Sequence, residues 1–274
     1  MAQYQLAATT RVPARDYDGY FFDLDGTVYL GDEPLPGAAD TIAALRQAGK
    51  MVAFLSNNPT KTPQQYADKL TGMGIATLAG DVITTIETTV RWLHGNYPQA
   101  VVYPIAEAPL CRALTDAGFA ISDDAKRVDV VIASYDRGFT YAKLQVAFDA
   151  LRRPSPAILI QTNPDPYCPF PDDAGQPDAG AITAAIEACA QVRCVANMGK
   201  PSPLLLEAAL SRHGLLATNC LMVGDRLSTD IAMAQYAGMD AAVVFTGQTK
   251  PSDLTEQYAD VYRLNQLCDL LPTA

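Results

Sequence analysis

The chain has 274 residues, 49% of them hydrophobic, which suits one large or two modest globular domains. Its 30 acidic and 20 basic residues give a net charge of -10, which argues against nucleic acid and anionic membranes as partners. No apolar run reaches the length of a membrane span, and the first residues lack the apolar stretch of a signal peptide, so we expect a cytoplasmic protein.

The elements predicted first along the chain alternate between strand and helix. GYFF at 19–22 has the apolar run of a buried strand, and a helix through Ile42 and Leu45 follows it and ends near Gly49. MVAFL at 51–55 is the next strand, and TPQQ at 62–65 opens a helix with an N-cap threonine, proline at N1 and a capping-box glutamine. Near the C-terminus, LMVG at 221–224, a helix over 229–237 and AAVVF at 241–245 continue the alternation. Such alternation predicts parallel strands in a doubly wound sheet.

The middle of the chain predicts a second α/β unit with elements of its own. The strands AVVYP, VDVVIAS and AILIQT alternate with a helix through Leu110 and Leu114 and a helix over 140–151. Residues 163–180, NPDPYCPFPDDAGQPDAG, are rich in proline and lack periodicity, which predicts a long loop that is either functional or disordered. We therefore expect a core domain in two parts, 1–98 and 196–274, and a separate domain over 99–195.

Polar clusters follow several of these strands or open a helix. Ligands of a doubly wound sheet bind at the carboxyl ends of its strands, so the clusters are candidate site residues. They are Asp23-Leu24-Asp25-Gly26-Thr27, Ser56-Asn57-Asn58, Gly199-Lys200-Pro201-Ser202-Pro203 and Gly224-Asp225-Arg226-Leu227-Ser228-Thr229-Asp230.

The chemistry of these clusters indicates a phosphate site with a hard cation. Asp23 and Asp25 repel each other unless a cation lies between them, and Asp225 adds a third carboxylate from another strand end. Ligation by oxygen alone suits Mg²⁺. The six cysteines form no CxxC pair, so a zinc site is not expected. We expect the cysteines to be reduced thiols, several of them in the core. The hydroxyl of Ser56, the Asn57 and Asn58 amides and the Lys200 ammonium can bind phosphate oxygens.

Each cluster alone has an ordinary explanation. Asn57-Asn58-Pro59 is a common turn sequence, Lys200 alone is a solvated loop lysine, and Asp230 alone is a carboxylate at a helix N-terminus. The combination of four clusters in this order is what favours function, and no competing nucleotide-binding motif is present.

The motifs DLDGT, SNN, GK and GDxxxTD resemble the four motifs of the haloacid dehalogenase-like hydrolases, over nearly the whole chain. The segments NPDP, GAI and GKPSP resemble sequences of the type IIA branch, which includes NagD-like, AraL-like, phosphoglycolate and pyridoxal phosphate phosphatases. The resemblance implies an α/β fold with a Rossmann-like parallel sheet core and an inserted α/β cap domain of type C2A. It also implies a homodimer formed through the cap.

Roles follow from the resemblance, residue by residue. Asp23 would be the nucleophile that forms an aspartyl-phosphate, and Asp25 the acid and base. Mg²⁺ would be held by Asp23, Asp225 and the backbone carbonyl of Asp25, with Asp230 as support. The transferring phosphoryl group would be bound by Ser56, Asn57, Asn58 and Lys200, of which Lys200 also counts as catalytic.

These features predict a phosphoric monoester hydrolase that acts on a small phosphorylated metabolite. A phosphomutase is the rival enzyme, but the stretch between Asp25 and Ser56 leaves little room for the small cap typical of mutases. A phosphometabolite-binding sensor with vestigial activity is the rival of another class, although no motif residue is missing.

The substrate stays open among sugar phosphate, phosphoglycolate, pyridoxal phosphate and nucleotide monophosphate. Tyr167 and Cys168 lie between prolines in the 163–180 loop, where a rigid backbone would present them to the leaving group. The resembling pyridoxal phosphate phosphatases have a histidine at what looks like the Cys168 position, so this departure argues against pyridoxal phosphate and favours a smaller or more polar substrate such as a sugar phosphate. The alternative is that the loop only packs the cap, with Cys168 buried as a small apolar residue.

Overall fold

The structure is a computed structural model that describes residues 10–169 and 174–271. Its contacts divide the chain into two compact units, and each is described by itself. The core unit comprises Met1–Leu55, Pro63–Ile83 and Leu206–Ala274, and the cap unit comprises Ser56–Thr62 and Thr84–Leu205. The boundaries expected at residues 98 and 195 stay a prediction, because compactness is a different criterion from the ends of an inserted domain.

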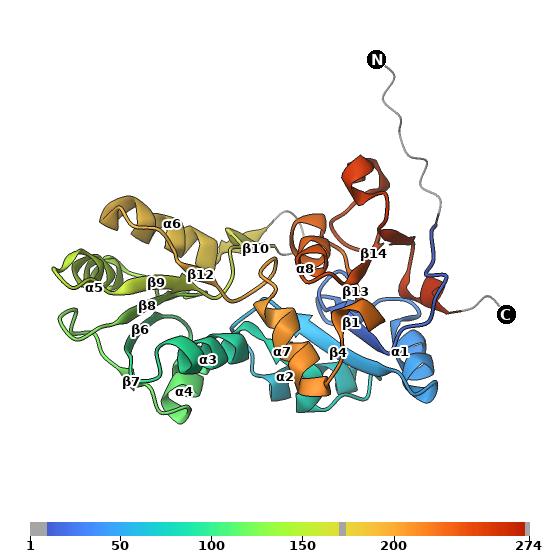
Figure 1. Cartoon of the computed structure of the whole chain (residues 1–274), viewed down its shortest axis with the longest axis horizontal. Coiled ribbons are helices and arrows are strands. Elements are labelled where there is room, and N and C mark those ends of the chain that lie inside the picture. The colour runs from blue at the N-terminus through green and yellow to red at the C-terminus, as the bar shows by residue number, and fades with distance from the viewer. Residues whose placement is uncertain (1–9, 170–173, 272–274) are drawn as a thin grey trace, which may run out of the picture. The chain divides into compact units, whose positions relative to one another are not determined.

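The core unit is built on a six-stranded sheet with the strand order β15-β14-β13-β1-β4-β5 (Figure 1). Its strands are β1 (Gly19–Asp23), β4 (Met51–Ser56), β5 (Val82–Thr84), β13 (Cys220–Gly224), β14 (Asp240–Val244) and β15 (Tyr262–Leu264). The strands from β15 to β4 pair in parallel. The doubly wound sheet predicted from the alternating pattern is therefore confirmed.

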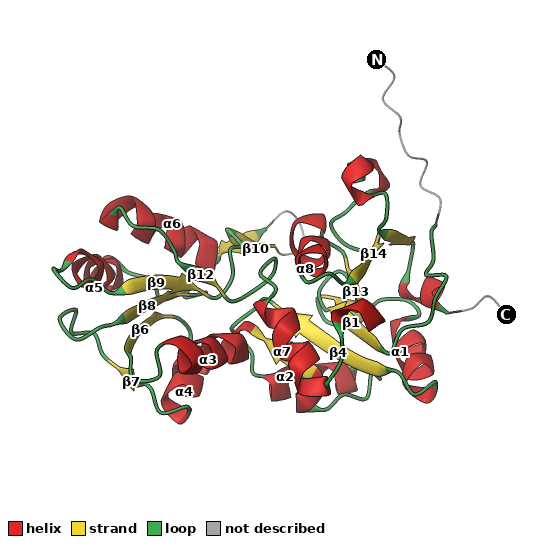
Figure 2. Cartoon of the chain, in the orientation of Figure 1, coloured by secondary structure: helices red, strands yellow, loops and turns green. Residues whose placement is uncertain are grey.

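The helices of the core unit follow the predicted alternation (Figure 2). They are α1 (Ala38–Gln47), α2 (Pro63–Gly72), α7 (Leu204–His213) and α8 (Ala232–Tyr236), with short helical turns η1 (Ala79–Asp81), η2 (Ala217–Asn219), η3 (Leu227–Ile231), η4 (Pro251–Asp253), η5 (Glu256–Tyr258) and η6 (Leu267–Leu270). The helix expected over 229–237 differs in its first turn, because η3 is π-helical and only then does α8 begin. Single π turns of this kind occur often at functional sites.

Alternate residues of the central strands build the hydrophobic core on one face of this sheet. Tyr20 and Phe22 of β1 pack with Phe54 of β4 and with Ile42 of α1 and Leu70 of α2 in one buried cluster. Side chains two residues apart share a face of a strand, so this pairing fixes which side α1 and α2 cover.

The chain order of the sheet reverses at β1. From β1 the chain builds β4 and β5 on one side, whereas β13, β14 and β15 lie on the other side. Phe22 of β1 is in register with Val223 of β13, so both strands end at the same edge of the sheet. The crevice outside such a reversal is where doubly wound sheets bind ligands.

The cap unit has its own parallel sheet, of strand order β12-β9-β8-β6-β7. Its strands are β6 (Val101–Ile105), β7 (Ala120–Ile121), β8 (Val130–Ala133), β9 (Ile158–Gln161) and β12 (Ala196–Asn197), and its helices are α3 (Thr85–Asn96), α4 (Ala108–Asp116), α5 (Tyr141–Arg152) and α6 (Ala179–Ala190). The second α/β unit expected from the middle of the chain is confirmed.

Helices cover both faces of the cap sheet, with α5 and α6 on one side and α3 and α4 on the other (Figure 1). In β8, Val131 and Ala133 pack with α5 and α6, whereas Val130 and Ile132 pack with α3 and α4. A strand buried on both faces needs a continuous apolar run, which is what the sequence VVIA supplies.

Two antiparallel hairpins complete the structure. β2 (Tyr29–Leu30) pairs with β3 (Glu33–Pro34), and β10 (Tyr167–Pro169) pairs with β11 (Gly175–Pro177). The stretch 163–180 was expected to be a loop without periodicity, and the hairpin β10–β11 corrects this. Residues 170–173 of that stretch lie outside the described residues.

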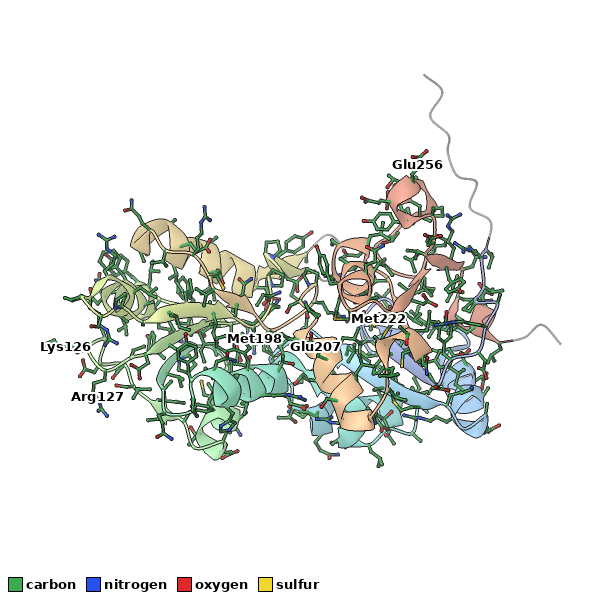
Figure 3. The ribbon with its side chains drawn as sticks, in the orientation of Figure 1. Lys126, Arg127, Met198, Glu207, Met222 and Glu256 are labelled. Carbon is green, nitrogen blue, oxygen red and sulfur yellow. The ribbon has the colours of Figure 1, made fainter. Side chains whose placement is uncertain are left out.

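The six cysteines are free thiols, with Cys220 buried and Cys189 exposed, so the expectation of several core thiols is correct only in part. Met198 and Met222 are buried within their units, and Glu256 is exposed (Figure 3). Of the helices in the described part of the chain, none combines the length and apolar character that crossing a bilayer requires.

Candidate active site

Three carboxylates converge at the carboxyl edge of the core sheet. Asp23 ends β1, Asp225 directly follows β13, and Asp230 lies in the π-helical turn η3. One carboxylate oxygen from each lies within 4.8 Å of the other two. The core unit therefore brings together three of the four residues expected near the metal, and the sequence pattern explains how, because adjacent parallel strands end side by side.

Asp225 is the most constrained member of this cluster. It is 1% exposed, and its Oδ2 accepts the backbone N–H of Gln248 at 2.7 Å. Its Oδ1 is buried and has no hydrogen-bond partner among the described residues. Burial, reinforced by the negative charges of Asp23 and Asp230, raises the pKa of the Asp225 carboxyl to about 7. A cation at this position would satisfy the buried oxygen and offset the repulsion.

Asp230 supports the same strand end from the following turn. It is fully buried, and its Oδ2 accepts the backbone N–H of Arg226 at 3.2 Å. This bond closes the turn that carries Asp225, so a carboxylate at position 230 fixes the backbone next to the cluster.

Asp25 lies in the turn after β1 and is exposed, in contrast to the buried carboxylates. The turn is closed by the backbone N–H of Gly26, which donates to Tyr29 at 2.8 Å, and the hydroxyl of Thr246 donates to the carbonyl of Gly26 at 2.7 Å. A carboxyl group that reaches solvent can exchange protons, which suits the acid and base role expected for Asp25.

The loop 246–249 after β14 was not singled out in the sequence. Besides the Gln248 contact, the backbone N–H of Thr249 donates to the carbonyl of Asp225 at 3.1 Å. A Cβ added to Gly247 would lie 2.0 Å from Oδ2 of Asp225, so only glycine fits without movement. The sequence signal for this loop is a Thr-Gly-Gln-Thr run directly after an apolar strand at the same sheet edge.

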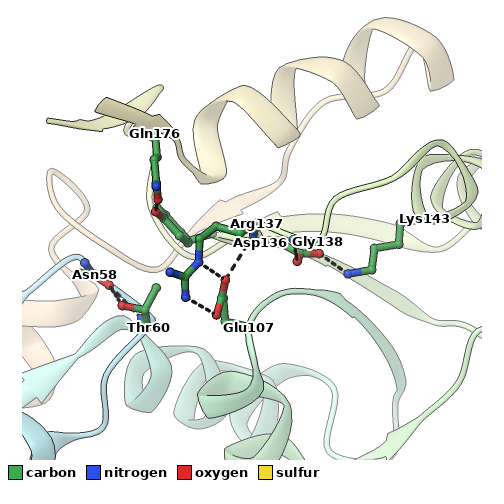
Figure 4. Close-up of polar contacts among 9 residues, drawn as sticks. Asn58, Thr60, Glu107, Asp136, Arg137, Gly138, Lys143 and Gln176 are labelled. Carbon is green, nitrogen blue, oxygen red and sulfur yellow. Dashed lines mark hydrogen bonds and ion pairs between the residues drawn. The ribbon is translucent and has the colours of Figure 1, made fainter. Parts of the chain in front are cut away.

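The predicted phosphate-binding residues of the cap unit form a second group. The hydroxyl of Ser56 accepts the backbone N–H of Asn58 at 3.2 Å. Oδ1 of Asn58 in turn accepts the backbone N–H of Thr60 at 2.9 Å (Figure 4). Both side chains thus shape the turn that follows β4, and the amide NH₂ of Asn58 is directed away from that turn.

Asn57 and Lys200 are joined directly. Oδ1 of Asn57 accepts the backbone N–H of Lys200 at 2.7 Å, and Nδ2 donates to the carbonyl of Lys200 at 3.1 Å and to Asp165 at 2.9 Å. Lys200 is 3% exposed. Since both amide protons of Asn57 are used in this way, a phosphate contact by Asn57 would fall to its backbone N–H. Phosphate binding by Asn57 stays a prediction.

The carboxyl edge of the cap sheet carries further polar contacts (Figure 4). Arg137, after β8, donates to Glu107, after β6, through Nε at 2.7 Å and Nη2 at 2.9 Å, and this ion pair holds the pKa of the Glu107 carboxyl below its usual range. Tyr135 donates to Gln176 of β11, which ties the hairpin to the end of β8. This hairpin carries Cys168 and also Tyr167, whose side chain is 56% exposed.

Family models match both ends of the chain. A haloacid dehalogenase-like hydrolase model matches residues 20–120, and a HAD-hydrolase-like model matches residues 197–270. The first match covers Asp23, Asp25 and Ser56, and the second covers Lys200, Asp225 and Asp230.

Relatives and solved structures agree with these models. Sugar-phosphatase AraL of Bacillus subtilis is 35% identical over 257 residues, which cover 93% of each chain. Acid sugar phosphatase of Staphylococcus epidermidis is 36% identical over 88% of this chain and 91% of its own. The crystal structure of 4-nitrophenylphosphatase from Thermotoga maritima superposes with a TM-score of 0.85 at 31% identity, over 93% of this chain and 96% of that one. The chain therefore belongs to the haloacid dehalogenase-like hydrolases, as a member of the type IIA branch with a cap domain.

Proposed function

We propose that this protein is a Mg²⁺-dependent phosphatase that hydrolyses small phosphomonoesters, with sugar phosphates as the favoured class, through an aspartyl-phosphate on Asp23. The observation that carries the proposal is the cluster of Asp23, Asp225 and Asp230, in a chain that shares 35% identity over 93% of its length with a sugar phosphatase. A phosphoric monoester hydrolase is the activity common to the relatives' names.

The residues of the cluster fit Mg²⁺. All three side chains offer carboxylate oxygens, one of which is buried without a hydrogen-bond partner among the described residues. Oxygen donors of this kind are the ligands of Mg²⁺ rather than of zinc. Asp23, Asp225 and the backbone carbonyl of Asp25 would hold the ion, and Asp230 would support Asp225. When bound, the ion would offset the negative charge of the carboxylates and of the substrate's phosphoryl oxygens.

The proposed reaction takes two displacements at phosphorus. A carboxylate oxygen of Asp23 forms a bond to phosphorus while the bond to the ester oxygen breaks, and Asp25 gives its proton to that leaving oxygen. Asp25, now ionised, takes a proton from water, whose oxygen bonds to phosphorus as the bond to Asp23 breaks. Phosphate leaves, and both carboxyl groups return to their starting states.

Residues of the cap unit would bind the charged oxygens of the phosphoryl group. Ser56 supplies a hydroxyl, Asn58 an amide NH₂ and Lys200 an ammonium, and donors fixed in advance stabilise charge that develops in the transition state. Asn57 would donate its backbone N–H to the phosphoryl group, and its side chain would hold Lys200 in place.

Discrimination between substrates would come from the hairpin β10–β11. Tyr167 is exposed and Cys168 half-buried, and the link from Gln176 to Tyr135 fixes the hairpin on the cap sheet. A rigid hairpin presents side chains with little loss of entropy, which suits recognition of a leaving group. Replacing Tyr167 by phenylalanine and Cys168 by serine should reorder the rates across substrates. If every rate falls by the same factor, the hairpin does not set specificity.

We also propose that the chain acts in the cytoplasm as a homodimer joined through the cap. Exposed apolar side chains of the cap unit are candidate self-association contacts, among them Tyr141 in α5 and, at opposite edges of the cap sheet, Ile121 on β7 and Val195 beside β12. Light scattering of the full chain tests the dimer, and replacing Tyr141 by serine or Val195 by threonine should shift it toward monomer.

The decisive experiment is a turnover screen of the purified chain with Mg²⁺. The panel contains sugar phosphates, phosphoglycolate, pyridoxal phosphate and nucleotide monophosphates, and released inorganic phosphate is measured. We expect hydrolysis of sugar phosphates, and none by the Asp23→Asn variant, because an amide cannot attack phosphorus. A wild-type chain that releases phosphate from no member of the panel faster than Asp23→Asn does would refute the proposal and favour a phosphometabolite sensor.

A further inference from the structure

A chain of polar contacts in the cap unit leads from the end of β9 to Lys200. Oδ2 of Asp165 accepts Nδ2 of Asn57 at 2.9 Å and Nδ2 of Asn163 at 3.1 Å. Asn163 is fully buried, and its Oδ1 lies 2.9 Å from the hydroxyl of Thr162, which is also fully buried. None of the proposed chemical steps uses Asp165, although its carboxylate is the charged group at the centre of these contacts.

The carboxylate fixes which way the Asn57 amide faces. An ionised carboxylate only accepts hydrogen bonds, so the NH₂ end of Asn57 must face Asp165. The carbonyl end then faces the backbone N–H of Lys200, at 2.7 Å. A reversed amide would bring two acceptors together at Asp165 and at the Lys200 carbonyl and two donors together at the Lys200 N–H, so all three contacts would be lost. Asp165 thus strengthens the orientation of Asn57 that the backbone N–H and carbonyl of Lys200 also favour.

The orientation of Asn57 in turn fixes the backbone of Lys200. The same amide accepts the N–H of Lys200 and donates to its carbonyl, so both polar backbone groups of that residue are held. The approach is close: a Cβ on Gly199 would lie 2.6 Å from Oδ1 of Asn57. Glycine at position 199 is what lets the amide reach the backbone.

We propose that Asp165 is a positioning residue for phosphoryl binding, because it orients Asn57 and through it sets the place of the Lys200 ammonium. The inference rests on the proposed function of Lys200. Misplacing a catalytic group by a fraction of the reacting distance slows a reaction strongly, so a residue that never touches substrate can still control the rate.

Three variants test this role by rate and by binding. Asp165→Ala should lower kcat/KM by up to on the order of 100-fold, the loss that a misplacement of about 1 Å at the reacting groups can cause. Asp165→Asn should retain part of the rate, because its carbonyl can still accept one amide proton, although a neutral bond is weaker. Asp149→Ala is the matched control and should match wild type, since among the described residues Asp149 accepts a bond only from the exposed Gln145 on α5.

A double-mutant cycle separates positioning from general damage. If Asp165 acts through Asn57, then adding Asp165→Ala to the Asn57→Ala variant should lower kcat/KM little further. If Asp165→Ala lowers kcat/KM by the same factor in the wild-type chain and in the Asn57→Ala variant, the proposal is overturned. So would an Asp165→Ala variant with unchanged kcat/KM.

Binding of inorganic phosphate gives a readout that does not need turnover. Calorimetric titration with phosphate in the presence of Mg²⁺ should show weaker binding for Asp165→Ala than for Asp149→Ala, with Asp165→Asn between them. Equal phosphate affinity in all three variants would overturn the inference. A wild-type chain that binds phosphate but hydrolyses no ester would refute the proposed function instead, so the two failures are distinguishable.

Discussion

Replacing Gly247 by alanine should displace the Asp225 carboxylate. The added Cβ would lie 2.0 Å from Oδ2 and 2.5 Å from Cγ of Asp225, far inside van der Waals contact. Asp225 is 1% exposed and close-packed, so either its carboxylate or the 246–249 backbone must move by roughly 1 Å or more. Both movements stretch the 2.7 Å bond from the N–H of Gln248 to Oδ2.

The expected loss of Mg²⁺ affinity follows from that bond. A hydrogen bond to a charged group contributes about 1.5–3 kcal/mol, which corresponds to roughly 10- to 150-fold in an equilibrium constant. Substitutions of groups that orient a metal ligand lower metal affinity or activity by a similar factor, about 10- to 100-fold. We therefore expect the Mg²⁺ concentration for half-maximal phosphatase rate to rise by on the order of 10- to 100-fold in Gly247→Ala.

The assay is a Mg²⁺ titration of the phosphate release rate with a saturating ester. Gly72→Ala is the matched control, because a Cβ at that helical position meets nothing within 4 Å. The same half-maximal Mg²⁺ concentration in both variants would show that the 246–249 loop absorbs the methyl group without moving Asp225. The reasoning about this close approach would then be wrong.

Three further predictions concern the same site. Asp25→Asn should keep Mg²⁺ and phosphate binding but slow turnover by on the order of 10²-fold in steady-state assays, and a wild-type rate would assign the proton transfer to another group. Excess chelator should abolish phosphate release and Mg²⁺ should restore it, with Ca²⁺ a poor substitute because it favours a larger coordination shell; full activity in chelator contradicts this. The third is a pH effect on the metal-free chain, whose Asp225 has its pKa raised from 3.8 to about 7. The folded state then holds a proton that the unfolded chain has released, so the free energy of unfolding should fall as pH rises from about 4 to about 7. Thermal melts without Mg²⁺ at several pH values test it, and a melting temperature that rises with pH would contradict the sign.

The fold was predictable because its elements carry long and regular patterns. The apolar run of β1 and the capping sequence before Pro63 are local signals, and the structure has a strand at 19–23 and a helix from Pro63. The hairpin β10–β11 was missed because each strand has three residues, and Pro169 and Pro177 lack the N–H that strand patterns rely on.

Parts of the site were predictable for the same reason and others were not. Asp23 and Asp225 stand directly after apolar strands, so their meeting follows from a parallel sheet. Asp165 acts on Asn57 across a separation of 108 residues, and no local pattern encodes that contact. The contact of the 246–249 loop with Oδ2 of Asp225 joins two strand ends across 23 residues, which composition and spacing do not reveal.

The pairing of β1 with β13 has a consequence for the order of folding during synthesis. Gly19 pairs with Cys220, whereas all five strands of the cap sheet lie between Val101 and Asn197. The ribosome therefore releases a complete cap sheet while β1 still lacks one neighbour, and an unpaired strand edge can pair with other chains. Closure of a contact so distant in the chain is slow. We expect β13 docking to limit refolding, and newly made chains to be most prone to aggregate just before Cys220–Gly224 emerges.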